Sequence, residues 1–318
     1  MIAGLRYGLC GVRTIQGRIG APVAPIRARN LAAGCDSLRM TILGAIFLPH
    51  NPPERLSDVA RAADDAGLEE LWLWEDCFQN SGIAAASAAL AWTRNLRVGI
   101  GILPVPFRNV ALTAMEIATM RRLFGDRAIV GVGHGVQEWM GQVGVRAASP
   151  MTLLREYVST LRSLLDGESV TTDGRYVHLD GVRLDWPPEP APPLLIGATG
   201  DKTLRLSGEL AQGTVLTGGT PPEGVARARE VIGASPHHIV VFLPAAFGPD
   251  GAGRLADQQR RYGIDDPGVA GDAAAVAEGV RRWAAAGADT VVLQPTVDDP
   301  DPVGFVRSVA EEVRPLVT

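Results

Sequence analysis

The sequence predicts a (β/α)8 barrel, also called a TIM barrel, over residues 40–318. Three observations carry this prediction. Eight short apolar runs occur along these residues, and each is too short to be a buried helix. Segments with helical spacing separate the runs, and the length suits this fold as a single domain.

The eight runs predict the strands of the barrel. They carry apolar residues at consecutive positions, as expected for parallel strands that are covered on both faces. They occupy residues 42–48, 71–74, 98–103, 128–132, 194–196, 214–216, 239–243 and 290–293.

The predicted helices show an apolar stripe, and residues typical of helix ends mark where they begin and stop. The clearest stripe places residues at i, i+3, i+4 and i+7 and consists of Leu153, Leu154, Tyr157, Val158, Leu161, Leu164 and Leu165. Ser149 and Pro150 predict a cap and a first-turn proline for this helix. Gly67 and Gly287 predict the ends of two other helices.

Two segments depart from the repeating pattern. Residues 167–193 scatter apolar side chains among glycine, aspartate and proline, which predicts an inserted hairpin between the fourth helix and the fifth strand. Residues 1–39 contain six arginines, one acidic residue and no sustained period, which predicts a disordered N-terminal extension. An Arg-rich transit peptide is the alternative for this stretch.

Composition excludes several classes of protein. A net charge of −5 provides no positive field for nucleic acid. The three cysteines have neither CxxC spacing nor a metal-like arrangement, so we expect no metal site and a reducing, cytoplasmic location. No apolar run approaches the roughly 18 residues of a membrane span, and no secretory signal begins the chain.

The active site of such a barrel is built from the segments that follow the strands. After the second strand, Glu75 and Asp76 follow an apolar Leu-Trp-Leu-Trp run, so we expect one carboxylate to turn into the mouth. Solvation or pairing with an arginine is the alternative for either. Cys77 is a candidate reactive thiol or, more simply, a small packed residue.

His134 follows the fourth strand between Gly133 and Gly135 and is the best placed of the five histidines for proton transfer. Simple contact with a cofactor or loop is the alternative. Gly99 and Gly101 lie inside the third strand, where glycine indicates either a bulge close to a ligand or tight barrel packing.

The turn after the fifth strand is a candidate phosphate site. It consists of Gly197, Ala198, Thr199 and Gly200 and leads directly into a helix, whose first N–H groups can bind an anion. A plain tight turn is the alternative. Lys202, the only lysine, lies beside this turn, either near a bound anion or paired with Asp201.

Several of these motifs together resemble the luciferase-like flavin and deazaflavin oxidoreductases. They run from Gly99-Ile-Gly-Ile-Leu-Pro to Arg108, then through Gly125-Asp-Arg127, Gly131-Val-Gly-His-Gly135 and Glu138-Trp139 to Gly197-Ala-Thr-Gly200 and Gly208-Glu-Leu-Ala-Gln-Gly213. The resemblance covers residues 40–318. It implies a barrel of the bacterial luciferase-like type that is expected to form a homodimer.

The resemblance also implies a site. Coenzyme F420 or FMN would lie at the mouth, with its phosphate near Gly197 and Gly200. A bulge with a non-prolyl cis peptide would involve Gly101 and Ile102. Two departures matter: the family's sugar-phosphate dehydrogenases have histidine where this chain has Cys77, and glutamate where it has Val136. Sugar-phosphate oxidation is therefore not expected.

Three functions follow as hypotheses. The first is an F420-dependent oxidoreductase that transfers a hydride to or from a small organic substrate, with Asp76 orienting the ring, Ile102 supporting it and His134 as a proton donor. The second is an FMN-dependent monooxygenase, which would need a flavin reductase as partner. The third is a non-catalytic cofactor-binding protein.

Overall fold

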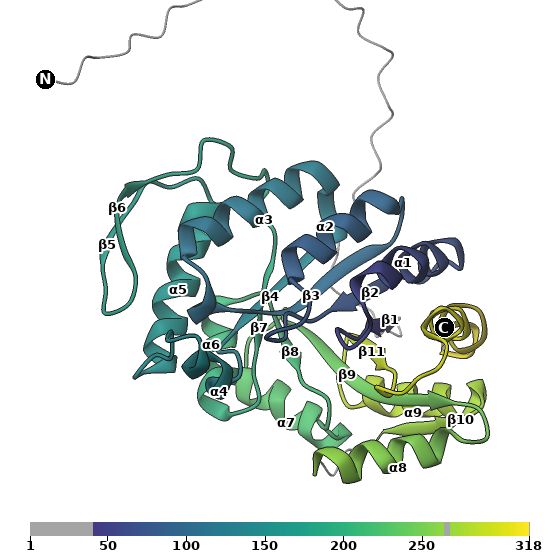
Figure 1. Cartoon of the computed structure of the whole chain (residues 1–318). Helices are drawn as coiled ribbons and strands as arrows, with labels where there is room; N and C mark the ends of the chain where they lie inside the picture. Colours follow the sequence, from purple (N-terminus) through teal and green to yellow (C-terminus); the bar gives the residue numbers. More distant parts are fainter. Residues whose placement is uncertain (1–40, 264–267, 318) are drawn as a thin grey trace, which may run out of the picture. The chain divides into compact units, whose positions relative to one another are not determined.

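Eight parallel strands of the computed structural model close into a ring, as the sequence predicts (Figure 1). The structure describes residues 41–263 and 268–317; Met40 and the predicted extension over residues 1–39 lie outside the described residues. The strands of the ring are β1 (Ile42–Phe47), β2 (Glu70–Leu73), β3 (Arg97–Pro104), β4 (Ala128–Gly133), β7 (Leu194–Gly197), β8 (Gly213–Leu216), β9 (His238–Phe247) and β11 (Thr290–Gln294). They follow this order around the ring, and β11 pairs with β1 to close it.

Side chains alternate between two cores along these strands. In β9, Val240 and Phe242 belong to the cluster inside the ring, whereas Ile239, Val241 and Leu243 pack outward against the helices. This period of two is the geometry of a strand, and both sets are buried because the helices cover the outer face. The apolar runs of the sequence thus reflect burial on both faces.

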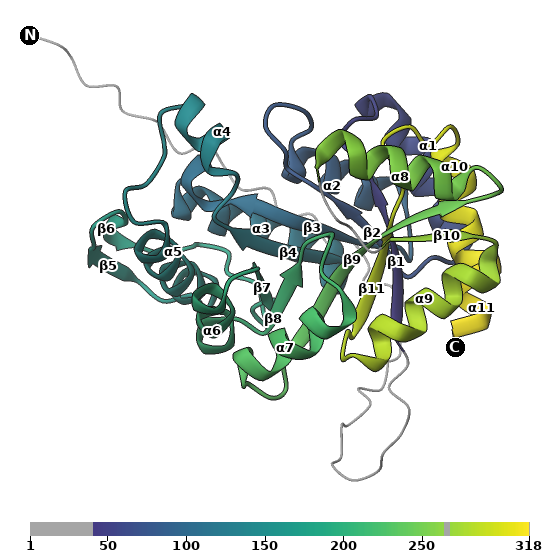
Figure 2. The ribbon, with the colours of Figure 1, turned by 90° about the horizontal axis from the view of Figure 1, so that it is seen from below.

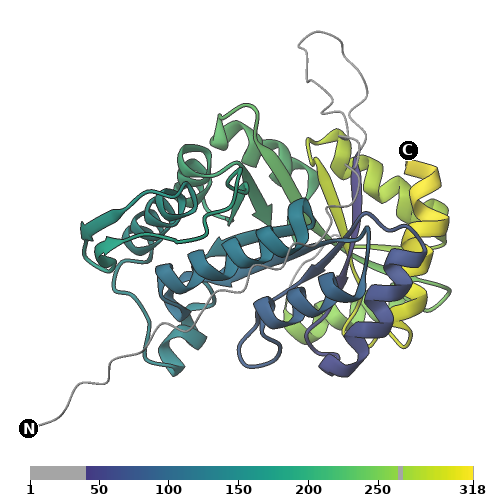
Figure 3. The ribbon, with the colours of Figure 1, turned by 90° about the horizontal axis from the view of Figure 1, so that it is seen from above.

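The helices surround the ring in the expected alternation (Figures 1 and 3). They are α1 (Leu56–Asp65), α2 (Gly82–Trp92), α3 (Val110–Phe124), α4 (Gln137–Gln142), α5 (Pro150–Leu165), α6 (Asp201–Leu210), α7 (Pro222–Ile232), α8 (Gly251–Tyr262), α9 (Ala273–Ala285), α10 (Pro302–Arg307) and α11 (Arg314–Val317). Short turns are η1 (Pro53–Arg55), η2 (Val105–Phe107), η3 (Gly125–Arg127) and the π-helical η4 (Ser308–Val313).

The structure confirms most of the helix ends that the sequence predicts. Gly67 and Gly287 follow α1 and α9 with φ values of +73° and +109°, which favour glycine. Pro150 begins α5, and Ser149 occupies its N-cap position. The predicted side-chain cap is wrong, however, because the Ser149 hydroxyl lies 2.8 Å from the Thr152 hydroxyl and does not bond to the backbone.

The inserted segment is the predicted hairpin. Antiparallel strands β5 (Val170–Asp173) and β6 (His178–Val182) lie between α5 and β7. Figures 1 and 2 show the hairpin at the opposite side of the barrel from α9 and α11. The sequence prediction missed β10 (Val269–Gly271), which pairs with residues 245–247 of β9 beyond the point where β9 leaves β11. Three residues are too few to show a strand period.

The irregularity expected in the third strand is present in β3. The register against β4 shifts between Ile100 and Leu103, and the Gly101–Ile102 peptide bond is cis. A second non-prolyl cis bond joins Cys77 to Phe78 after β2. Both features lie at the carboxyl ends of their strands, on the rim where the candidate site is expected.

Candidate active site

A cavity of about 390 Å³ opens at the carboxyl ends of β2, β3, β4, β7 and β8. It brings together nine of the predicted site residues: Asp76, Gly101, Ile102, Gly133, His134, Gly135, Gly197, Ala198 and Thr199. Gly99 and Gly200 are the two predicted residues that do not line it. Residues up to 123 positions apart in the sequence, Asp76 and Thr199, thus meet at one end of the barrel, as the fold requires.

Ile102 forms part of the cavity wall because three glycines make room for its side chain. A Cβ atom at Gly131 or Gly197 would come within 3.0 Å of Ile102 Cγ2, and one at Gly133 within 3.2 Å of Ile102 Cγ1. These glycines belong to β4 and β7. Part of the glycine pattern therefore serves to place Ile102.

The two glycines of β3 have different surroundings. A Cβ at Gly99 would lie 2.4 Å from the Trp72 indole, so this glycine permits the tight barrel packing that was one of its two interpretations. A Cβ at Gly101 would lie 2.7 Å from the Phe242 ring, and Gly101 lines the cavity. Gly99 does not line the cavity, so the prediction that it contacts a cofactor gains no support from the structure.

Glu75 and Asp76 adopt opposite roles in the turn after β2. Glu75 accepts two hydrogen bonds of 2.8 Å from Arg108 and one of 2.9 Å from the Gly82 N–H at the start of α2. Asp76 has no ion-pair partner within the described part of the chain, and its carboxylate is partly buried in the cavity. Burial raises the pKa of Asp76 to about 6. Asp76 is therefore the carboxylate that turns into the mouth.

Cys77 follows Asp76 without the character of a reactive thiol. Burial, together with the negative charges of Glu75 and Asp76, raises the pKa of Cys77. A raised pKa keeps the thiol protonated at neutral pH and hence a poor nucleophile. The packed-residue interpretation of Cys77 fits this environment better.

His134 lies on the other side of the cavity with one ring nitrogen unsatisfied. Its Nε2 is 3.3 Å from the Thr203 hydroxyl of α6, and its buried Nδ1 has no hydrogen-bond partner among the described residues. Burial lowers the pKa of His134, which favours the neutral imidazole at pH 7. In this form Nδ1 can accept a proton, or donate an N–H if it carries the hydrogen.

The predicted phosphate turn lies at the N-terminus of α6. Ala198 and Thr199 line the cavity, and a Cβ at Gly200 would meet no atom within 4 Å, so the backbone is open to a ligand there. Lys202 is exposed. The alternative pairing of Lys202 with Asp201 is wrong, because Asp201 bonds to Arg227 at 2.6 Å and approaches Arg205 at 3.9 Å.

Sequence reasoning missed two aromatic residues of this cavity. Trp74 follows β2 and lines the cavity, and its buried Nε1 has no partner among the described residues. Phe242 of β9 packs on Trp74 with ring centroids 5.9 Å apart. Both residues lie in apolar runs that look like ordinary strand core. An unsatisfied indole N–H becomes visible only once the packing is known.

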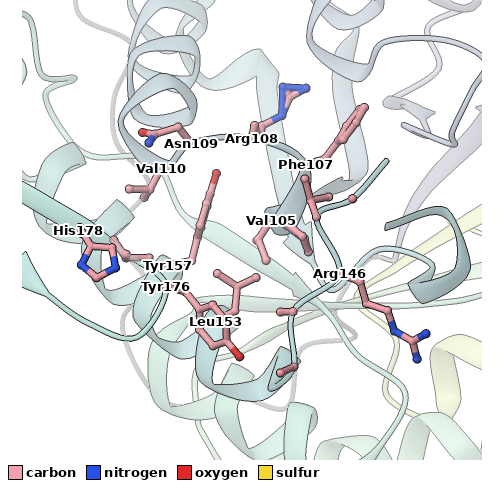
Figure 4. Close-up of a pocket in the computed structure, with 16 residues that line it drawn as sticks. Val105, Phe107, Arg108, Asn109, Val110, Arg146, Leu153, Tyr157, Tyr176 and His178 are labelled. Atoms are coloured by element: carbon pink, nitrogen blue, oxygen red, sulfur yellow. The ribbon is translucent and has the colours of Figure 1, made fainter. Parts of the chain in front are cut away.

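A larger cavity, of about 500 Å³, lies outside the ring of strands (Figure 4). Segments of η2, α5 and the β5–β6 hairpin surround it, and Figure 4 shows Tyr157 and Tyr176 beside Leu153 in its wall. It contains none of the predicted site residues, and its Arg108 already pairs with Glu75. The smaller cavity on the rim is therefore the better candidate active site.

The rim cavity fits a flavin-like group by three of its features. Its apolar lining includes Ile102 and Phe242, and glycines allow close approach of the backbone. The unsatisfied Nδ1 of His134 and the unpaired carboxylate of Asp76 lie beside this lining. An open helix N-terminus at Gly200 can bind a phosphate. The described residues contain no cluster of three or more His, Cys, Asp or Glu side chains able to hold a metal ion.

None of the helices in the described ranges is both long and apolar enough to cross a membrane.

Comparisons with known proteins agree with this geometry. The profile of the family described as luciferase-like monooxygenase matches residues 35–314. A 5,10-methylenetetrahydromethanopterin reductase of Methanolobus tindarius is 28% identical over 214 residues, covering 65% of each chain. An F420-dependent glucose-6-phosphate dehydrogenase of Nakamurella multipartita is 30% identical over 186 residues, covering 54% of each chain. The chain thus matches less than two thirds of the length of either relative.

A solved structure shares the fold over nearly its whole length. The coenzyme F420 dependent tetrahydromethanopterin reductase from Methanopyrus kandleri superposes with a TM-score of 0.75 at 20% identity. The superposition covers 87% of this chain and 99% of that one. It identifies the fold of the barrel.

Proposed function

Because this chain belongs to the luciferase-like monooxygenase family, we propose that it is an F420-dependent oxidoreductase that transfers a hydride to or from a small organic substrate. The observation that carries the proposal is the rim cavity itself. It combines an apolar wall at Ile102 with one unpaired carboxylate, that of Asp76. Curated relatives named for F420 support this choice of cofactor.

The residues of the cavity would hold the deazaflavin from three directions. Gly101 and Ile102 would support the ring, Asp76 would accept a hydrogen bond from a ring N–H, and the turn from Gly197 to Gly200 would bind the phosphate. Gly133 and Gly135 flank His134 on the cavity wall and allow close approach there. When bound, the cofactor supplies the hydride chemistry, and the protein supplies binding and orientation.

His134 would move or hold the proton that accompanies the transfer. Its Nδ1 is buried without a partner, and its lowered pKa leaves this nitrogen free to accept a proton near neutral pH. Burial favours the neutral imidazole at pH 7, which is the form that can accept a proton, so a proton-accepting role suits this resting state better than the proton-donating role expected from the sequence. The proposal further includes a cytoplasmic location, expected from the cysteine content, and a homodimer, which the family resemblance implies.

An anaerobic titration of the full chain with F420 and with FMN tests the proposed function. We expect F420 to bind and FMN to bind at least tenfold more weakly. Asp76→Asn should weaken F420 binding about tenfold, the effect of one lost charge-assisted hydrogen bond. Asp58→Asn, on the exposed face of α1, is the matched control and should bind as the wild type does.

Two results would contradict the proposal. Tight binding of FMN without F420 binding, with oxygen consumed when reduced FMN is supplied by a flavin reductase, would identify a monooxygenase instead. Binding of F420 without turnover across a broad panel of alcohols, ketones and imines would identify a cofactor-binding protein.

A further inference from the structure

A second compartment adjoins the cofactor cavity on the same rim. It has a volume of about 260 Å³ and lies over the carboxyl ends of β1, β9 and β11, bounded by α8. Trp74 and Gly218 line both cavities. Because these two residues follow β2 and β8, the two cavities together cover the whole ring and meet at Trp74 and Gly218.

The described lining of this second compartment is uncharged. No aspartate, glutamate, lysine or arginine occurs among its lining residues within 41–263 and 268–317. These are Leu48, His50, Trp74, Gly218, Pro244, Leu255, Gln258, Gln259, Tyr262, Gln294 and Val297. Burial and the nearby Arg261 lower the pKa of His50, so its imidazole is neutral at pH 7.

The charged side chains near this compartment are paired or exposed to solvent, and Arg261, which acts on His50, is exposed. Arg254 of α8 pairs with Asp299 at 3.0 Å and donates to the Phe247 carbonyl at 2.8 Å. An anion brought into this compartment would lose its hydration and gain only the solvent-screened attraction of the exposed Arg261, which is unfavourable. The wall therefore opposes carboxylates and phosphates.

The polar groups that remain suit a neutral oxygen. The buried Trp74 Nε1 is a hydrogen-bond donor with no partner among the described residues. The Gln258 Oε1 accepts from the Val297 N–H at 2.9 Å, which leaves the amide N–H groups of Gln258 as donors. A buried donor without a protein partner is rare in native proteins and calls for an acceptor from a ligand or an ordered water.

We propose that this compartment binds the second substrate, a small neutral molecule with an apolar body and a carbonyl or hydroxyl oxygen that accepts a hydrogen bond from Trp74 Nε1. This inference rests on the proposed function, because it places the substrate beside the cofactor cavity. The volume lies below the roughly 300–1,000 Å³ of drug-sized pockets, so the molecule is small. Carboxylated and phosphorylated molecules of similar shape are rejected.

Ligand-observed NMR on the full-length, F420-loaded protein tests the inference without requiring turnover. The probes are matched pairs: cyclohexanone with 4-oxocyclohexanecarboxylate, and benzyl alcohol with 4-(hydroxymethyl)benzoate. The neutral member of at least one pair should bind, and its carboxylated partner should bind at least tenfold more weakly. Methylcyclohexane, which has no acceptor oxygen, serves as the apolar control ligand.

Two substitutions sharpen the test. Trp74→Phe keeps an aromatic ring and removes the N–H, so it should weaken binding of the neutral ketone or alcohol about fivefold and leave methylcyclohexane unchanged. Gln294→Lys, at the end of β11, introduces a cation and should improve binding of the carboxylated partner about tenfold. Gln142→Lys, at an exposed position of α4, is the matched control and should change neither.

The possible failures are separable. Absence of F420 binding would contradict the proposed function. If F420 binds, the inference is overturned when no neutral probe binds, when both members of each pair bind equally, or when Trp74→Phe weakens methylcyclohexane as much as the ketone. An unchanged charge preference in a folded Gln294→Lys variant also overturns it.

Discussion

The two compartments of the barrel rim differ in charge, although they share Trp74 and Gly218. The larger one contains Asp76, an unpaired carboxylate, and His134. The smaller one has apolar and amide side chains and no ionised group within the described part of its wall. The difference indicates that the unpaired carboxylate belongs to the half proposed for the cofactor, while the described wall of the other half, which includes the neutral imidazole of His50, is proposed to select small neutral ligands.

Within the larger compartment, the two neighbouring carboxylates also differ in their contacts. Glu75 and Asp76 are neighbours in one turn, yet Glu75 is fixed by Arg108 and by α2, whereas Asp76 is free to contact a ligand. One carboxylate thus holds the turn in place so that the other can face the cavity.

Removing Glu75 should destabilise the turn after β2, which holds Asp76 in the larger compartment. Glu75→Ala leaves the buried Arg108 without its bidentate partner and the Gly82 N–H without an acceptor, so we expect the free energy of unfolding to fall by about 3–5 kcal/mol. Urea denaturation measures this. Glu278→Ala removes only an exposed pair with Arg281 and should cost below about 0.5 kcal/mol. A loss under about 1 kcal/mol for Glu75→Ala would show that Glu75 does not hold the turn.

Displacing Ile102 should weaken cofactor binding in the larger compartment and leave ligand binding in the smaller one unchanged. In Gly197→Ala, the new Cβ would lie 3.0 Å from Ile102 Cγ2 and push this side chain toward the cavity. We expect the Kd for F420 to rise about tenfold, and binding of neutral probes in the other compartment to change little. Gly253→Ala, where a Cβ meets no atom within 4 Å, is the control. Unchanged F420 binding in Gly197→Ala would remove Ile102 from the cofactor contact.

Asp76 should make stability depend on pH. Its pKa rises from the ordinary 3.8 to about 6 on folding, so the folded protein binds more protons between these values. The stabilisation that protonated Asp76 provides is complete below pH 3.8 and is lost as the pH rises through 6. Asp76→Asn should therefore gain stability over the wild type by about 1 kcal/mol more at pH 7.5 than at pH 5. Urea curves for both proteins at the two pH values test this, and an equal gap at both would contradict it.

Lys202 should contribute least. An exposed lysine beside a phosphate in the first turn of α6 adds about 0.3–1 kcal/mol at low salt, so Lys202→Gln should weaken F420 about threefold in 20 mM salt and less in 300 mM salt. A salt-independent loss above tenfold would instead make Lys202 a direct ligand of the cofactor.

The sequence predicted the ring and the location of the site well, because both follow from local patterns. Buried parallel strands are apolar at every position, and the segments after them converge at one rim. The three-residue β10 escaped for lack of a period. Gly99 was grouped with the cofactor contacts, although it makes room for Trp72.

Contacts across the ring could not be predicted from local patterns. The donor on Trp74, the fit of Ile102 over glycines from two other strands and the choice between Glu75 and Asp76 all depend on strand register and on partners distant in the chain. The neutral compartment was likewise invisible, because α8 supplies much of its wall.

A crystal structure of the F420-loaded protein tests the central claim most directly. The account predicts density for the deazaflavin ring against Gly101 and Ile102, on the Asp76 side of Trp74, with the compartment lined by His50 and Gln294 left open. Density for the ring in that second compartment, or in the cavity outside the barrel beside Tyr157, would contradict the account.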